Sequence, residues 1–177
     1  MGRLFLLLLL SVMSATGCAQ TDRYAPVSVA ELLQYQRRKG ASTTVRPPFA
    51  KYGADRIRAA SVLADDDPRQ LWGRSVGRNE EYLPARQPLY RLFRKTADDA
   101  VAFIDTTGGS LQMVFWDKRY YLRLTRGLRQ LGFVELPNGR SNVLPFRRRD
   151  TTLRVDITVW NDMYVMEITV APSSGQP

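Results

Sequence analysis

Two stretches near the C-terminal end alternate between apolar and polar residues, and they constrain the fold more than any other feature. Successive strand residues point to opposite faces of a sheet, so each stretch predicts a strand with one buried face. The intervening Asn161-Asp162 suits a two-residue hairpin turn. The sequence therefore predicts an antiparallel hairpin over residues 153–170. Its expected cross-strand pairs are Val159 with Tyr164, Ile157 with Met166, Val155 with Ile168 and Leu153 with Val170.

Residues 111–136 predict a strand, a helix and a second strand in succession. Residues 111–116 are almost all apolar, as in a covered strand, and Asp117 can cap the helix that follows. Gly132 and Phe133 have the composition of a Schellman stop at the helix end. The helix presents one apolar stripe, formed by Tyr121, Leu124, Leu128 and Leu131.

The N-terminal half carries one strong helix signal. Ser28 and Glu31 fit a capping box, and the helix expected over residues 29–39 ends in basic residues followed by Gly40. A capped helix, a glycine and a strand thus occur in both halves, so the N-terminal half is a candidate degenerate copy of the C-terminal half.

The segments between these units carry weaker signals. Glycines and prolines favour a long loop near 65–88, in which Trp72 and Tyr82 are the large anchors. Either aromatic residue could stack on a ligand or fix the loop to the core. The remaining expectations are a short strand over 42–46, a helix over 54–64, a strand or helical turn over 89–95 and a capped helix over 97–104.

Together these elements predict a single α+β domain over residues 28–172, built on an antiparallel sheet of about four to five strands with helices packed on one face. Residues 111–116 and three C-terminal strands would form its centre. The strand over 144–149 is expected at an edge because it contains Pro145. A domain of this size buries enough surface to fold without a disulfide or metal. Residues 173–177 are expected to form a disordered tail.

Residues 1–19 have the pattern of an export signal, since Arg3 precedes an apolar run that ends in small residues. The stretch Ala15-Thr16-Gly17-Cys18 resembles the lipobox of bacterial lipoproteins, which implies a lipidated Cys18 at the mature N-terminus and a membrane anchor. Cleavage after Ala19 is the alternative, and it would release a chain without Cys18. Both routes place the domain outside the cytoplasm, either periplasmic, anchored at the outer membrane or secreted. Residues 20–27 are expected to be a tether.

The sequence contains one Cys and no His. This excludes intrachain disulfides, His-dependent acid/base catalysis and the Ser-His-Asp and Cys-His nucleophiles, and it disfavours most zinc and copper sites. No cofactor, metal or catalytic set is expected. The predicted hairpin does place Asp156 opposite Glu167, at a spacing that retaining glycosidases use. Because Arg147 and Arg154 are expected nearby, we interpret this pair as a neutralised surface cluster.

The formal net charge is +9, which favours anionic partners. A row of arginines on the outer side of the helix after Asp117 is a candidate anion-binding or partner-binding site, because guanidinium groups make paired hydrogen bonds to phosphates and carboxylates. A solvated helix face is the alternative interpretation. No nucleic-acid motif is visible, so no nucleic acid is expected as a partner. The row consists of Arg119, Arg123, Arg126 and Arg129.

These features predict an exported, membrane-anchored envelope protein of bacterial type with a non-catalytic binding or scaffolding role. Its partner would be an envelope protein or an anionic polymer. One alternative is an exported inhibitor or immunity-type protein that occludes an enzyme. The other is an envelope hydrolase that uses only Asp and Glu.

Overall fold

The computed structural model of the chain describes residues 27–39, 45–57, 63–64, 66–137 and 142–171. The helices are α1 (Val29–Lys39) and α2 (Lys118–Gln130), with short 3-10 helices η1 (Pro48–Tyr52) and η2 (Leu89–Leu92). The strands are β1 (Asp55–Ile57), β2 (Arg69–Arg74), β3 (Val76–Arg78), β4 (Phe93–Lys95), β5 (Val101–Thr106), β6 (Leu111–Phe115), β7 (Val134–Glu135), β8 (Val143–Arg147), β9 (Leu153–Trp160) and β10 (Met163–Val170).

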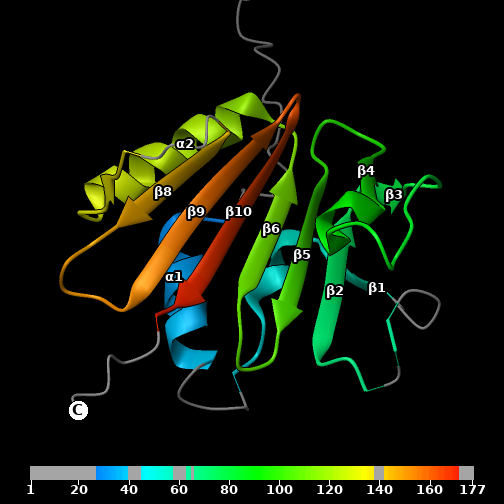
Figure 1. The fold of residues 1–177 in the computed structure, drawn as a ribbon, viewed down its shortest axis with the longest axis horizontal. Coiled ribbons are helices and arrows are strands. Elements are labelled where there is room, and N and C mark those ends of the chain that lie inside the picture. The colour runs from blue at the N-terminus through cyan, green and yellow to red at the C-terminus, as the bar shows by residue number, and fades with distance from the viewer. Residues whose placement is uncertain (1–26, 40–44, 58–62, 65, 138–141, 172–177) are drawn as a thin grey trace, which may run out of the picture.

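Most of these strands form one antiparallel sheet of eight strands, in the order β1-β2-β5-β6-β10-β9-β8-β7 (Figure 1). Strands β3 and β4 form a separate two-stranded sheet. The predicted sheet of about four to five strands is therefore wrong. The additional strands come from segments for which the sequence predicted helices or a loop.

Strand β5 explains one of these errors. Its residues are buried on both faces of the sheet, because Phe103 points into one core while Ala102 and Ile104 point into the other. A strand covered on both faces has a continuous apolar run and loses the two-residue alternation that identifies a strand. The helix predicted over 97–104 is thus wrong. The helix predicted over 54–64 is also wrong for residues 55–57, because these residues form β1 and pair with β2.

The loop predicted near 65–88 is also wrong for residues 69–74 and 76–78, which are β2 and β3. The strand β2 is polar at both ends and contains Gly73, so it has little of the composition that marks a strand. Its position is set by pairing with β5, in which Leu71 lies opposite Ile104 and Trp72 lies opposite Phe103. This pairing is a tertiary effect that local composition does not reveal.

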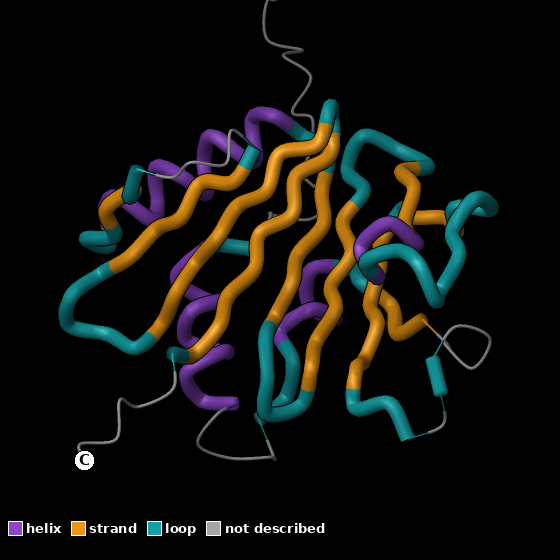
Figure 2. The backbone as a smooth tube through the Cα atoms, viewed as in Figure 1, coloured by secondary structure: helices purple, strands orange, loops and turns teal. Residues whose placement is uncertain are grey.

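The sheet separates two hydrophobic cores. Both α-helices cover one face, which we call the inner face, and their apolar residues pack there against residues such as Phe103, Ile157 and Met166. Residues 79–95 cover part of the opposite, outer face, where Tyr82, Leu89, Leu92 and Phe93 form the second core with residues of β2, β5, β6 and β10. Figure 2 shows the helices behind the sheet and this segment in front of β2 and β5.

The predicted C-terminal hairpin is confirmed in register. Strand β10 pairs with β9 so that Val159 faces Tyr164 and Leu153 faces Val170. Asn161 has the positive φ of 47° that a tight hairpin turn requires. Pro145 lies in β8, one strand away from the edge, because the two-residue β7 pairs outside it. The strand that contains Pro145 was predicted at the sheet edge, but the edge is formed by β7.

The predicted start and end of α2 are confirmed. The Asp117 carboxylate accepts a hydrogen bond of 2.7 Å from the Arg119 amide. At the other end, the Phe133 amide donates to the Leu128 carbonyl and the Gly132 amide to the Arg129 carbonyl, which is the Schellman pattern. Of the predicted stripe, Leu124 and Leu128 are buried while Tyr121 and Leu131 are half-buried. Tyr120 and Thr125 complete the buried side.

The capping box at the start of α1 is confirmed as well. Ser28 and Glu31 exchange backbone-to-side-chain hydrogen bonds, and Lys51 and the Tyr52 hydroxyl also bind the Glu31 carboxylate. Burial raises the pKa of Glu31, but hydrogen bonds from Lys51, Tyr52 and Ser28 outweigh this effect and lower the pKa to about 2. The start of α1 is thereby joined to η1.

The end of α1 is fixed by a buried charged network. The Lys39 ammonium group lies 2.5 Å from the Asp105 carboxylate, and it also donates to the carbonyls of Thr106 and Ser110. The Tyr35 hydroxyl donates to the other oxygen of Asp105 at 2.5 Å. Burial and this hydrogen bond raise the pKa of Tyr35. The network therefore holds the helix against the turn between β5 and β6.

The two halves of the chain have the same topology. Each contributes one helix followed by four strands of the large sheet, and the halves meet where β6 pairs with β10. This arrangement agrees with the predicted degenerate repeat. The N-terminal half differs in carrying the insertion of residues 76–95, which contains β3 and β4.

Several predictions lie outside the described residues. These are the export signal, Cys18, the tether up to residue 26, most of the strand over 42–46 and the tail. Within the described part of the chain, no helix is both long and apolar enough to cross a membrane.

Candidate functional site

Residues 79–95 form a cover that is fixed firmly to the outer face of the sheet. Its buried aromatic residues are Tyr82 and Phe93, each about 5% exposed. The Asn79 side chain holds the two ends of the cover together, because its amide donates to the Arg91 carbonyl at 3.2 Å and its oxygen accepts from the Glu81 amide at 3.1 Å. The cover is therefore a rigid wall over one half of the outer face.

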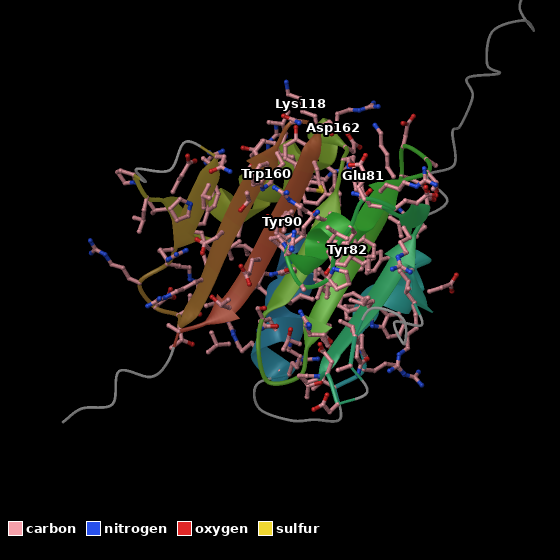
Figure 3. The ribbon with its side chains drawn as sticks, turned by 45° about the vertical axis from the view of Figure 1, so that its right-hand side comes forward. Glu81, Tyr82, Tyr90, Lys118, Trp160 and Asp162 are labelled. Atoms are coloured by element: carbon pink, nitrogen blue, oxygen red, sulfur yellow. The ribbon has the colours of Figure 1, made fainter. Side chains whose placement is uncertain are left out.

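A hollow of about 610 Å³ lies between this cover and the turn that joins β9 to β10. We call it the tryptophan hollow, because Trp116 and Trp160 both line it. Polar side chains surround these two rings, and they include Asn79, Glu81, Gln87, Arg91, Arg94, Lys95, Asn161 and Asp162. Figure 3 labels Trp160 and Asp162 at the end of the hairpin, with Glu81 and Tyr82 on the cover.

Trp160 is the exposed aromatic residue of this hollow. Its side chain points to the outer face at the end of β9, and 38% of the residue is exposed. The Arg91 guanidinium carbon lies 4.6 Å from the Trp160 ring centroid, which is a cation–π contact. Among the described residues the Arg91 guanidinium has no hydrogen bond or ion pair. Its donors therefore remain available while its plane is held by the ring.

Charged residues of both signs form the rim of the hollow. Lys95 on β4 lies 3.7 Å from Asp162 in the hairpin turn, so an exposed ion pair joins the cover to the turn. Arg94 is exposed, and in the described part of the chain its guanidinium makes no hydrogen bond or ion pair. The hollow thus combines a flat apolar surface with two guanidinium groups that can bind an anion.

Over the other half of the outer face, no segment of the described residues covers the sheet. Asp156 faces Glu167 across β9 and β10, as the hairpin predicted. Arg147 binds Asp156 at 2.7 Å, and the Gln112 amide donates to Glu167 at 3.1 Å. Neither carboxylate lines the tryptophan hollow. Asp156 is thus neutralised by Arg147, whereas the partner of Glu167 is a neutral amide.

The four arginines predicted as a binding row lie along the exposed side of α2, but they are not equivalent. Arg129 forms an ion pair of 2.8 Å with Glu135. Arg119 lies 3.9 Å from Asp117 and has a side chain that is 92% exposed. Arg123 lies over the Tyr120 ring at 5.9 Å. Arg126 is exposed and has no ion pair among the described residues.

Trp72 and Tyr82, the other two predicted contact residues, pack against the core, where Trp72 is half-buried and Tyr82 is buried. Trp72 packs edge-on against Phe49, with ring centroids 5.8 Å apart, and Tyr82 belongs to the second core. Sequence reasoning did not identify Trp116 and Trp160. A signal for Trp160 was present, because the alternation that buries Val155, Ile157 and Val159 points Trp160 to the opposite face.

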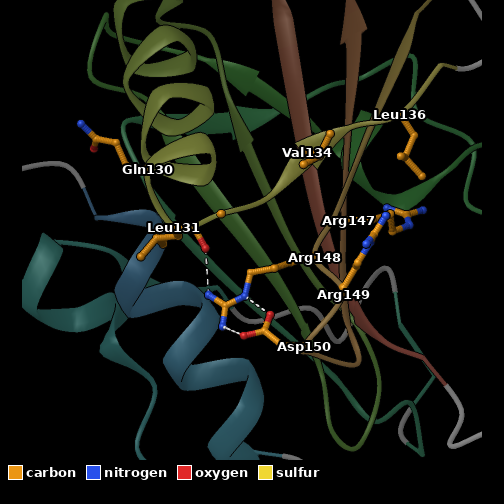
Figure 4. Close-up of a pocket in the computed structure, with 9 residues that line it drawn as sticks. Gln130, Leu131, Val134, Leu136, Arg147, Arg148, Arg149 and Asp150 are labelled. Carbon is orange, nitrogen blue, oxygen red and sulfur yellow. Dashed lines mark hydrogen bonds and ion pairs between the residues drawn. The ribbon is translucent and has the colours of Figure 1, made fainter.

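A second hollow, of about 950 Å³, lies beyond the C-terminal end of α2 (Figure 4). Its lining contains three consecutive arginines, but Arg147 binds Asp156. Arg148 binds Asp150 and also donates to the Leu131 carbonyl at 2.8 Å. Two of its three arginines are thus paired with carboxylates, whereas Arg91 and Arg94 of the tryptophan hollow have no ion pair among the described residues. The tryptophan hollow is therefore the stronger candidate site.

Comparison with family models, with curated proteins and with solved structures finds no match to this chain.

Proposed function

We propose that this chain is an exported, membrane-anchored envelope protein that binds an acidic polymer of the envelope through the tryptophan hollow and performs no catalysis. The observation that carries the proposal is the contact between Arg91 and Trp160 at the mouth of the hollow. Ligand sites are typically concave and combine apolar surface with a few oriented polar groups. The hollow has these properties.

The chemistry of this contact suggests the class of ligand. The Trp160 ring offers a flat apolar surface, which suits the C–H face of a sugar ring. An arginine stacked on a ring loses less conformational entropy when it binds, and its edge can make paired hydrogen bonds to a carboxylate. Arg94 adds a second cation close by. A glycan that carries carboxylates would satisfy both groups at once.

Catalysis is not part of the proposal, for two reasons. The sequence has no His. The facing carboxylates Asp156 and Glu167 lie outside the hollow, and each has a hydrogen-bond partner. The inhibitor alternative has less support, because the long loop predicted near 65–88 contains β2 and β3 and is fixed to the core through Tyr82.

The binding proposal is tested with Trp160→Ala and with the matched control Arg154→Ala. Arg154 is exposed on the same strand and the same face, outside the hollow. The probes are polygalacturonate, which carries carboxylates, and dextran, which carries none. We expect Trp160→Ala to weaken polygalacturonate binding about fivefold, since the lost stacking contact contributes about 1 kcal/mol.

Arg91→Gln should weaken the same interaction, and Arg154→Ala should leave it near the wild-type affinity. Isothermal titration or affinity electrophoresis measures all three. Equal affinity of wild type and Trp160→Ala for polygalacturonate would contradict the proposed site. The membrane anchor is tested separately by intact mass spectrometry of the membrane fraction, where a mature chain that starts at Gln20 without a lipid adduct would contradict it.

A further inference from the structure

We propose that α2 docks on an anionic phospholipid surface through its exposed side, on the face of the domain opposite the tryptophan hollow. We call this exposed side the basic face, and it consists of Lys118, Arg119, Leu122, Arg123 and Arg126. At 3.6 residues per turn these positions lie on one side of the helix, opposite the buried Tyr120, Leu124 and Leu128.

The charges of the basic face are largely available for a partner. Among the described residues, Lys118, Arg123 and Arg126 form no ion pair, and Arg119 is only loosely paired with Asp117 at 3.9 Å. The α2 helix itself contains no carboxylate. Asp117 precedes its first turn, and Glu135, which follows its last turn, already binds Arg129. Leu122 is 50% exposed between the cations. A cluster of cations on the exposed side of a helix is attracted to anionic lipid headgroups.

The path of the chain places this face near the proposed anchor. The Tyr120 hydroxyl on α2 donates a hydrogen bond of 2.6 Å to the carbonyl of Val27, and both residues are buried. The chain therefore enters the domain beside the first turn of α2. Residues 19–26 separate Val27 from Cys18, and such a segment reaches at most about 30 Å when fully extended. This step rests on the proposed lipid anchor, whereas the charge and exposure of the basic face do not.

The shape of the surface favours a membrane over a single small anion. Arg119 and Arg126 line none of the three hollows described for this chain. Arg123 does line a hollow, of about 130 Å³, but there the three carboxylates of Asp98, Asp99 and Asp117 outnumber the two cations, Arg74 and Arg123, and disfavour an anion. A convex helix with spaced cations suits a surface of many charges. Each cation near such a leaflet contributes about fivefold to the partition coefficient.

The consequence is a defined orientation. The helices cover the inner face of the sheet, while Trp116 and Trp160 belong to the outer face. Docking through the basic face therefore directs the tryptophan hollow away from the bilayer, where it is open to a polymer.

The experiment uses the unlipidated mature chain from Gln20 onward, which keeps every described residue. Its binding is measured to vesicles of phosphatidylglycerol mixed with phosphatidylcholine and to vesicles of phosphatidylcholine alone. The test variant is Arg119→Gln/Arg123→Gln/Arg126→Gln. The control variant, Arg56→Gln/Arg86→Gln/Arg154→Gln, removes the same net charge from exposed arginines elsewhere. Circular dichroism verifies that each variant is folded.

We expect binding to the anionic vesicles only, and a loss of roughly 100-fold in the partition coefficient of the test variant, as three contributions of about fivefold combine. The control variant should lose no more than about threefold, because distant charges are screened. Equal losses in the two variants, no loss in the test variant, or failure of the wild type to bind would each overturn the proposal.

A site-specific label provides a second readout. The chain from Gln20 onward contains no Cys, so an introduced Cys is the only attachment point for a fluorophore. Headgroup-attached quencher lipids should quench a label at Leu122→Cys strongly and a label at Arg154→Cys weakly. Equal quenching would overturn the orientation. Because this protein has no lipid and an intact hollow, the result is independent of lipidation at Cys18 and of polymer binding at Trp160.

Discussion

Replacing Lys39 by Met should destabilise the fold more than any exposed charge replacement in this chain. The ammonium group of Lys39 satisfies three acceptors at the turn between β5 and β6, and the side chains of Lys39 and Asp105 are only 8% and 7% exposed. Removal of the amine leaves the Asp105 carboxylate buried, with the Tyr35 hydroxyl as its single side-chain donor among the described residues. A buried charge that loses its partner is strongly destabilising.

The expected loss can be estimated from this arrangement. Breaking a buried pair by removing one partner costs about 3–5 kcal/mol. The Tyr35 hydrogen bond remains, so we expect the lower end, about 3 kcal/mol of the free energy of unfolding. With a urea m-value of about 2 kcal/mol/M, the unfolding midpoint would fall by about 1.5 M. The change in tryptophan fluorescence during urea unfolding measures this shift.

Two further variants test the reasoning. Lys39→Met/Asp105→Asn removes both charges, so it should cost less than the two single variants together. Lys95→Met removes a charge from the exposed pair with Asp162, whose side chains are 47% and 70% exposed, and should cost less than about 1 kcal/mol. If Lys39→Met cost no more than Lys95→Met, or if the double variant were simply additive, the buried network would not have the stabilising role inferred for it.

Two other perturbations have defined outcomes. The pKa of Glu31 is lowered from 4.5 to about 2 in the folded state, so its stabilising contribution is present above pH 4.5 and is lost as the pH falls towards 2. Since the site is partly exposed, we expect about 1 kcal/mol, and Glu31→Gln should flatten acid unfolding curves in that range. Gly132 has a φ of 80°, and a Cβ added there would make only an ordinary contact of 3.5 Å with the Arg148 Cδ, so Gly132→Ala should cost about 1–2 kcal/mol from backbone strain alone. Urea unfolding measures that loss, and an unchanged midpoint would contradict the Schellman assignment.

The sequence predicts those elements whose signals are local. The cap of α2 at Asp117, its buried face and its stop at Gly132 all lie within one short stretch of sequence. The register of the β9–β10 hairpin follows from the alternation of apolar and polar residues in its two strands. Such elements need no knowledge of the rest of the chain. Their boundaries and pairings were therefore predictable.

The remaining strands depend on distant partners. Strand β5 is covered on both faces, so Phe103 and Ile104 carry no alternation that distinguishes a strand from a helix. Strand β2 is polar and is defined by its pairing with β5. The candidate site was missed for the same reason, since Trp160 becomes part of a hollow only when residues 79–95 fold over the outer face. The alternation in β9 predicts that Trp160 points outward, but it does not predict that Arg91 lies against the Trp160 ring.

The matching order of elements in the two halves has a consequence for how the chain can be divided. Most strands that are neighbours in the large sheet also follow one another along the chain. The loops that close these pairs are therefore short or moderate in length, and their entropy costs are modest. The helix α1, however, packs against β10 and α2, which belong to the other half. Neither half can bury its apolar surface alone. The repeat is thus visible in the path of the backbone, while the unit of cooperative unfolding is the whole sheet with both of its helices.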